Sequence, residues 1–254
     1  MNEAIAAFVR RHDPDRFLTA LFAPPHKRDA LLTLYAFNHE LARAREAVSE
    51  PPLALIRLQW WREVVEGARR RQEVADPLAA AIETGELRQD DLLALIEARE
   101  MEAEPAIETL SAWRDYLMGS AGGLAVAAAR LLGAEDPAIV RLHGAVYGAA
   151  GVLRSVPILA RQNRCLLPKD VLAEHGLSPE AVIAQPNAPA VVRQLADTAM
   201  GWLSGAPRVP RVAIPAALPA VLARRDLRRL PWAPRPRGFG DRLAVIVTGL
   251  AGRI

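Results

Sequence analysis

Prolines mark where helices begin in this chain, and almost no part of it carries a strand pattern. Asp13-Pro14, Asp76-Pro77 and Ser178-Pro179 each combine a helix-capping residue with a proline at the first helical position, where its missing N–H costs nothing. Apolar residues then recur every three or four positions, whereas alternation of polar and apolar residues is nearly absent. The sequence therefore predicts an all-α fold.

The predicted helices follow one another with short gaps. One runs from Pro25 to Val48 and ends at Ser49-Glu50-Pro51-Pro52, and the next begins at Leu53 and stops near Gly67. The others are Pro77–Thr84, Gln89–Glu104, Ile107–Leu132, Pro137–Arg161, Pro179–Ile183, Pro189–Leu203 and Leu218–Arg225. Because no linker or repeat interrupts them, we expect one helical domain over residues 1–204.

Residues 205–254 differ from the rest in composition. Seven prolines between Gly205 and Arg242 predict repeated breaks, so we expect an irregular extension packed on the bundle, with a terminal helix over Leu243–Leu250. Residues 203–254 hold ten arginines against two aspartates, a balance of +8 within a net charge of +3. This asymmetry indicates an anionic partner, such as a membrane surface, or arginines that cap helices and pair with the acidic remainder; the sequence leaves both open.

Several classes of site are not expected. Cys165 is the only cysteine, so no internal disulfide can form, and the segment before Arg11 lacks a signal-peptide core, which favours a cytoplasmic protein. The five histidines are far apart, and there is no phosphate loop, nucleophile elbow or zinc-binding cysteine pair. The tail arginines alternate with prolines and apolar residues, so a nucleic-acid partner is not expected either.

Two segments carry the most specific pattern. The first is LYAFNHELARARE at residues 34–46, followed by RLQWWRE at 57–63, and the second is GVLRSVPILARQNRCLLP at 151–168. Their order and separation resemble the squalene/phytoene synthase family of isoprenoid synthases, over about the first 180 residues. The resemblance implies a helical bundle around a central cavity.

The residues that carry catalysis in that family are missing here. Active members condense two prenyl diphosphates and hold Mg²⁺ with aspartates on two facing helices, where carboxylates three or four residues apart share one face. The first aspartate motif falls on Ala42, Arg43, Ala44, Arg45 and Glu46, and the second on Ser155, Val156, Pro157, Ile158 and Leu159. Only Glu46 can ligate a metal, so we expect no catalytic residue, no metal and no other cofactor. Glu100, Glu104 and Glu108 are spaced for replacement ligands but are interpreted as a solvated face.

A subgroup of the family lacks these aspartates and includes a mitochondrial assembly factor for respiratory complex I. Pro157, Leu167-Pro168-Lys169-Asp170 and His175-Gly176-Leu177-Ser178 are similar to that subgroup. The resemblance implies a non-catalytic protein that assists complex I assembly, with complex I subunits or assembly factors as partners and a peripheral position at the inner membrane. The alternative is a prenyltransferase that condenses farnesyl or geranylgeranyl diphosphates with Mg²⁺ in a reorganised site.

Arginines near the lost metal positions indicate a second possibility. If the family fold holds, His39, Arg43, Glu46 and Arg154 line the cavity and make it basic. A basic cavity can hold an anionic lipid head group or an isoprenoid phosphate without metal. The alternative is that Arg43 pairs with Glu40 or Glu46 and that Arg154 caps local carbonyls.

Overall fold

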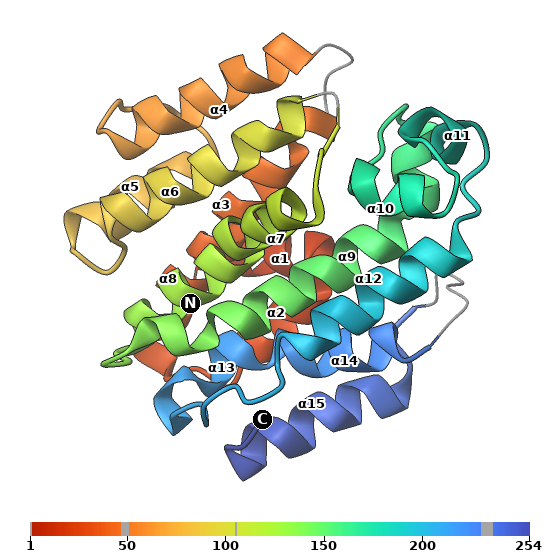
Figure 1. Ribbon diagram of the computed structural model, residues 1–254. Coiled ribbons are helices and arrows are strands. Elements are labelled where there is room, and N and C mark those ends of the chain that lie inside the picture. The colour runs from red at the N-terminus through yellow and green to blue at the C-terminus, as the bar shows by residue number, and fades with distance from the viewer. Residues whose placement is uncertain (1, 47–50, 105, 230–235) are drawn as a thin grey trace.

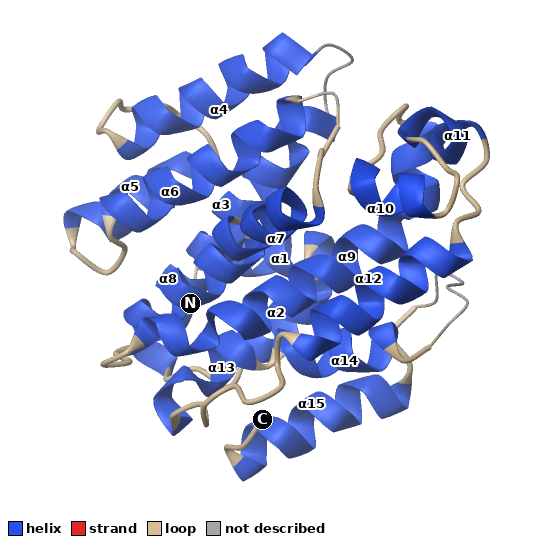
Figure 2. Ribbon diagram, viewed as in Figure 1, coloured by secondary structure: helices blue, strands red, loops and turns tan. Residues whose placement is uncertain are grey.

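The computed structural model describes residues 2–46, 51–104, 106–229 and 236–254. All regular structure in these ranges is helical, which confirms the all-α prediction (Figure 2). The first helices are α1 (Glu3–His12), α2 (Pro14–Ala20), α3 (Arg28–Glu46), α4 (Pro51–Val65), α5 (Ala75–Glu83) and α6 (Gln89–Glu100). They are followed by α7 (Leu110–Gly119), α8 (Ala121–Leu132), α9 (Arg141–Arg161), α10 (Lys169–Glu174), α11 (Pro179–Ala184) and α12 (Pro189–Gly201). The last are α13 (Ile214–Ala217), α14 (Pro219–Leu227) and α15 (Phe239–Ala251).

Two of the three predicted proline starts are confirmed. The side chain of Asp13 accepts a hydrogen bond from the N–H of Arg16 at 3.0 Å, and that of Ser178 accepts one from Ala181 at 3.2 Å. The prediction for Asp76-Pro77 is wrong, because α5 begins at Ala75. There the side-chain oxygen of Gln72 accepts hydrogen bonds from two N–H groups at the start of the helix.

The long helix predicted over Ile107–Leu132 is two helices. The chain leaves helical geometry at Ser120, which has φ −76° and ψ −83°. The Ser120 hydroxyl donates a 2.6 Å hydrogen bond to the carbonyl of Tyr116, one turn earlier. Such a bond between a serine side chain and the preceding turn bends a helix. The break separates α7 from α8 beside the cavity described below.

Helix α9 is the centre of the fold, and α7, α8, α12 and α14 pack against it (Figure 1). Gly144 marks its closest approach to α8: a Cβ placed there would lie 2.6 Å from the Cβ of Ala125 and 2.9 Å from the Cα of Gly122. The same helix carries Pro157 in its interior. Because α9 is held on several sides by its neighbours, the residues along it have fixed positions in the bundle.

The irregular tail predicted after residue 204 is wrong in part for its described residues: α14 confirms the helix predicted over Leu218–Arg225, and α13 is a helix that was not predicted. Pro215 and Pro219 lie in the first turns of α13 and α14, where proline is tolerated, so they begin helices instead of breaking them. The terminal helix is present but starts at Phe239. Helix α14 packs against α9, and α15 packs on α14, at the lower edge of the molecule in Figure 1.

Three further features concern a helix end, membrane spans and the cysteine. The predicted end of a helix at Val48 lies outside the described residues. Within the described ranges, every helix is too short or too polar to cross a membrane. Cys165 is buried and unbridged, and burial raises the pKa of its thiol.

Candidate functional site

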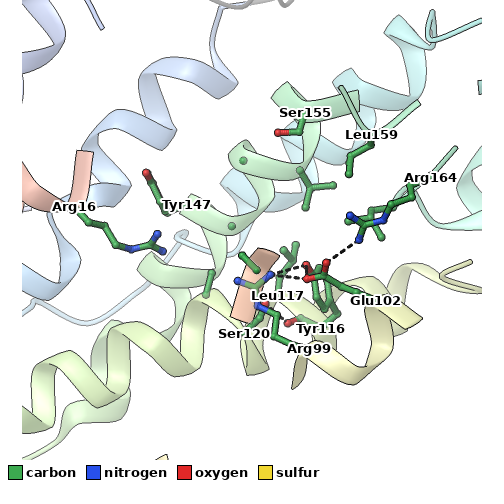
Figure 3. Close-up of a pocket in the computed structure, with 16 residues that line it drawn as sticks. Arg16, Arg99, Glu102, Tyr116, Leu117, Ser120, Tyr147, Ser155, Leu159 and Arg164 are labelled. Carbon is green, nitrogen blue, oxygen red and sulfur yellow. Dashed lines mark hydrogen bonds and ion pairs between the residues drawn. The ribbon is translucent and has the colours of Figure 1, made fainter. Parts of the chain in front are cut away.

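A cavity of about 230 Å³ opens among α3, α7, α9 and the turn that follows α6 (Figure 3). Ala42 on α3 lines one side of it, and Ser155 and Leu159 on α9 line another. These positions come from the two motifs that were expected to carry aspartates. The structure thus brings the two altered motifs together at one cavity.

The other predicted cavity residues lie elsewhere. His39 stacks on His12 with ring centroids 4.7 Å apart, and Arg43 is exposed. Arg154 donates to Asp226 at 2.9 Å, so it pairs with a carboxylate instead of capping carbonyls. None of these three residues lines the cavity, and the side chain of Glu46 lies outside the described residues.

The cavity is nevertheless basic, through arginines that the sequence interpretation did not select. Arg16, Arg99 and Arg164 line it, and Glu102 is the only carboxylate among the described residues that do. Figure 3 shows Glu102 between Arg99 and Arg164. The positive charge predicted for this cavity therefore comes from α2, from the end of α6 and from the segment after α9.

Glu102 is the centre of a buried hydrogen-bond network. It is 7% exposed and accepts from Arg99 Nη1 at 2.5 Å, from Arg164 Nη2 at 2.8 Å and from the Tyr116 hydroxyl at 2.8 Å. Arg99 also donates to the side-chain oxygen of Asn38 at 3.3 Å. Both carboxylate oxygens of Glu102 are occupied, so this residue is held in place as a partner for arginines.

Burial and the arginines have opposite effects on Glu102. Burial raises the pKa of its carboxyl group, but the guanidinium groups of Arg99 and Arg164 outweigh burial and hold the pKa below its ordinary value. Burial also raises the pKa of Tyr116, which helps to keep its hydroxyl protonated. Glu102 is therefore an anion at neutral pH, and Tyr116 is a neutral donor to it.

Arg16 lies on the opposite side of the cavity. Its Nη1 donates to Asp13 at 2.8 Å, and its guanidinium stacks over the ring of Tyr147 with its carbon 4.6 Å from the centroid. Burial lowers the pKa of Arg16, but Asp13 more than offsets it and the pKa rises above its ordinary value. The cavity thus has a permanent cation on each side.

The residues present do not fit a magnesium site. Mg²⁺ requires oxygen ligands, usually carboxylates, whereas the described residues at the two motifs that line this cavity are Ala42, Ser155 and Leu159. Glu102 is already bound by two guanidinium groups. Among the residues that the structure describes, there is also no cluster of His, Cys, Asp and Glu suited to a metal ion.

Some of the tail arginines follow one of the two possibilities that the sequence left open, the pairing with acidic residues. Arg225 and Arg229 bind Asp241 at 2.7 Å, and Arg237 binds Asp15 at 2.6 Å and Asp226 at 2.7 Å. These arginines pair with acidic residues, and Arg237 joins the tail to α2. Other tail arginines have no carboxylate partner within the described ranges and are considered below.

Comparison with known proteins identifies the family. The model for squalene/phytoene synthase matches residues 9–245, so the chain belongs to this family. The predicted family is confirmed, and the match extends beyond the first 180 residues into the tail.

Its relatives include proteins of two kinds. The chain is 29% identical over 237 residues to the rat protein named NADH dehydrogenase (ubiquinone) complex I, assembly factor 6, covering 87% of this chain and 71% of that one. It is 26% identical over 191 residues to presqualene diphosphate synthase of Sinorhizobium fredii, covering 70% of this chain and 67% of that one. A solved dehydrosqualene synthase superposes with a TM-score of 0.77 at 14% identity, covering 97% of this chain and 94% of that one, and this likeness shows the fold.

Proposed function

We propose that the chain is a non-catalytic member of its family that assists the assembly of respiratory complex I at the inner face of the membrane. The similarity to complex I assembly factor 6 supports the assembly role. The altered cavity supports the loss of catalysis. Tail arginines that have no carboxylate partner among the described residues support a peripheral position at an anionic membrane.

The observation that carries the proposal is the pairing of Glu102 at the cavity. Condensation of two prenyl diphosphates requires neutralisation of several phosphate charges, which metal ions held by carboxylates provide. Here Ala42, Ser155 and Leu159 offer no carboxylate, and Glu102 is occupied by Arg99 and Arg164. In this proposal the protein retains the cavity of its fold without free carboxylates to hold the metal.

Co-purification tests the assembly role. The full chain, carrying an affinity tag, is isolated from its own cells under mild detergent, and the bound proteins are identified. We expect subunits or assembly factors of complex I to be enriched over a preparation from untagged cells. Recovery of the chain without any of them would contradict the proposed partners.

The presence of a presqualene diphosphate synthase among the relatives makes a prenyltransferase the second candidate. Incubation with farnesyl or geranylgeranyl diphosphate and Mg²⁺ distinguishes the two functions. We expect no condensation product and no release of diphosphate. Turnover above that of a heat-inactivated sample would contradict the non-catalytic proposal.

The cavity can still bind an anionic lipid or prenyl phosphate. Arg164 and Arg99 supply charge, while Leu117, Val152 and Leu166 supply apolar surface. The probe is farnesyl diphosphate in the presence of EDTA, measured by titration calorimetry. Ser155→Trp should abolish binding by filling the cavity, whereas Ile158→Trp, at a 48% exposed position of the same helix, should bind normally. Equal binding by both variants, or no binding by the wild type, would contradict this role.

A further inference from the structure

A continuous row of apolar side chains is exposed along α15. The row begins at Phe239 and continues with residues four, seven, eight and eleven positions later, which are Leu243, Ile246, Val247 and Leu250. Residues at these spacings share one side of a helix. We call this set the α15 apolar face. Exposure ranges from 38% for Ile246 to 82% for Phe239. Of the eleven large hydrophobic side chains exposed in the described part of the chain, five belong to this face.

The opposite side of α15 fixes the helix to the bundle. Val245 is fully buried, and the backbone of Gly249 lies against the ring of Phe22. Asp241 in the first turn is 4% exposed and accepts hydrogen bonds from Arg225 and Arg229. Because α15 is anchored in this way and its apolar residues are exposed, the α15 apolar face points away from the bundle. The helix itself lies at the lower edge of the molecule in Figure 1.

A basic groove of about 230 Å³ lies beside this helix, between α14 and α15. It is lined by Arg224, Arg228 and Arg253, among others. Burial and the charge of Arg228 lower the pKa of Arg224. Within the described ranges, none of these three arginines has a carboxylate partner. The groove is therefore a place where an external anion gains charge-assisted hydrogen bonds.

Basic residues occur on both flanks of the apolar face. One residue along a helix is a rotation of about 100°. Arg242, which is exposed, precedes Leu243 and lies on one flank, whereas Ala244 and Thr248 follow Leu243 and Val247 and line the groove on the other. The exposed surface is thus an apolar row with positive charge along each side.

We propose that the α15 apolar face and its flanking arginines form a docking surface for a bilayer of anionic phospholipid. Such a bilayer supplies phosphates that can bind the arginines, and an apolar layer beneath the phosphates that can take up the α15 apolar face. A second copy of this chain would instead bring the same arginines against one another. The inference rests on the peripheral membrane position proposed above and names the surface that produces it.

Flotation of the purified full chain with lipid vesicles tests this surface. We expect binding to vesicles of phosphatidylglycerol and phosphatidylcholine that weakens with added salt, and little binding to phosphatidylcholine alone. The double variant Leu243→Gln/Val247→Gln should reduce binding about tenfold or more. The control Leu53→Gln/Ile56→Gln changes two exposed apolar residues on α4, at the opposite edge of Figure 1, and should bind like the wild type. Circular dichroism checks that each variant is folded.

A second pair of changes isolates the charge. Arg224→Gln/Arg228→Gln should weaken binding to anionic vesicles and leave the small binding to neutral vesicles unchanged. Equal binding of the wild type to both kinds of vesicle, equal binding by the α15 and α4 variants, or a vesicle-free dimer that Leu243→Gln/Val247→Gln dissociates would each overturn the proposal. The vesicle assay contains no respiratory subunit. A failure to bind vesicles would therefore overturn the docking surface alone, and co-purification decides the assembly role.

Discussion

Arg164 and Glu102 are 62 residues apart in the sequence and form a buried ion pair at 2.8 Å. The pair connects the segment after α9 to the turn after α6, and both residues line the cavity. The pair places the guanidinium group of Arg164 at the cavity that α3 and α9 line, the two helices on which other residues occupy the expected aspartate positions. The cavity therefore has its own fixed charges, three guanidinium groups and one carboxylate among the described residues that line it.

Removing the charge of Glu102 should destabilise the fold. Glu102→Gln leaves Arg99 and Arg164 without their anion in a buried site, which costs about 3 kcal/mol. Urea unfolding measures the loss. Glu104→Gln, at an exposed position two residues away, is the control and should change stability by less than about 0.5 kcal/mol. Similar values for the two variants would show that the network does not hold this part of the fold.

Two glycines of α9 should respond oppositely to alanine. In Gly144→Ala the new Cβ meets Ala125 and the backbone of α8, so the helices must separate and stability falls by about 2 kcal/mol. In Gly151→Ala the Cβ meets nothing within 4 Å, and the better helix former adds about 0.5–1 kcal/mol. Thermal and urea unfolding of both variants check the signs, and a stable Gly144→Ala protein would contradict the close packing of α8 and α9.

The buried His143 and the half-buried His39 should make stability depend on pH. Burial, with a smaller effect of Arg224, lowers the pKa of His143 to about 4, and burial with His12 and Arg43 lowers that of His39 to about 4. The unfolded chain takes up these protons near pH 6.5, before the folded chain does, so the free energy of unfolding should decrease as the pH falls from 6.5 to 4. The 3% exposed His143 should contribute about 2–3 kcal/mol of this loss.

Urea unfolding across this pH range provides the check. His143→Gln should flatten the dependence, and His26→Gln, at an exposed position, should keep the wild-type slope. Unchanged slopes in both variants would contradict the assignment of neutral His143 to the folded protein.

Arg237 should hold the tail on the bundle. Its guanidinium binds Asp15, 222 residues earlier, and Asp226 on α14. Arg237→Ala leaves these two buried carboxylates with fewer partners and should cost about 3 kcal/mol in urea unfolding. Arg114→Ala removes an exposed arginine and should leave stability nearly unchanged. An equally small effect of both changes would show that the tail is held by apolar packing alone.

The sequence predicted the helix starts that depend only on neighbouring residues in the chain. Asp13-Pro14 and Ser178-Pro179 begin helices as expected because their caps depend only on the residues that follow. The break at Ser120 and the short helix α13 were not predicted, although the helices α14 and α15 of the tail were. The break depends on a side chain that bonds to the preceding turn, and α13 depends on a proline that falls in a first turn, which spacing alone does not reveal.

The site was predictable in its position but not in its residues. Motif spacing located Ala42, Ser155 and Leu159, and all three line the cavity. Arg99 and Glu102 have the i, i+3 spacing of an ion pair, which is a local signal that was overlooked. Their contact with Arg164 depends on how α6 and α9 pack, and no short-range pattern carries that information.

The most direct test of the central claim is the amount of assembled complex I in cells that lack this protein. The account predicts that deletion reduces both assembled complex on native gels and NADH dehydrogenase activity of membranes. It also predicts that the wild-type chain, which is expected to show no prenyl transfer, restores both. Normal complex I in the deletion strain would contradict the account.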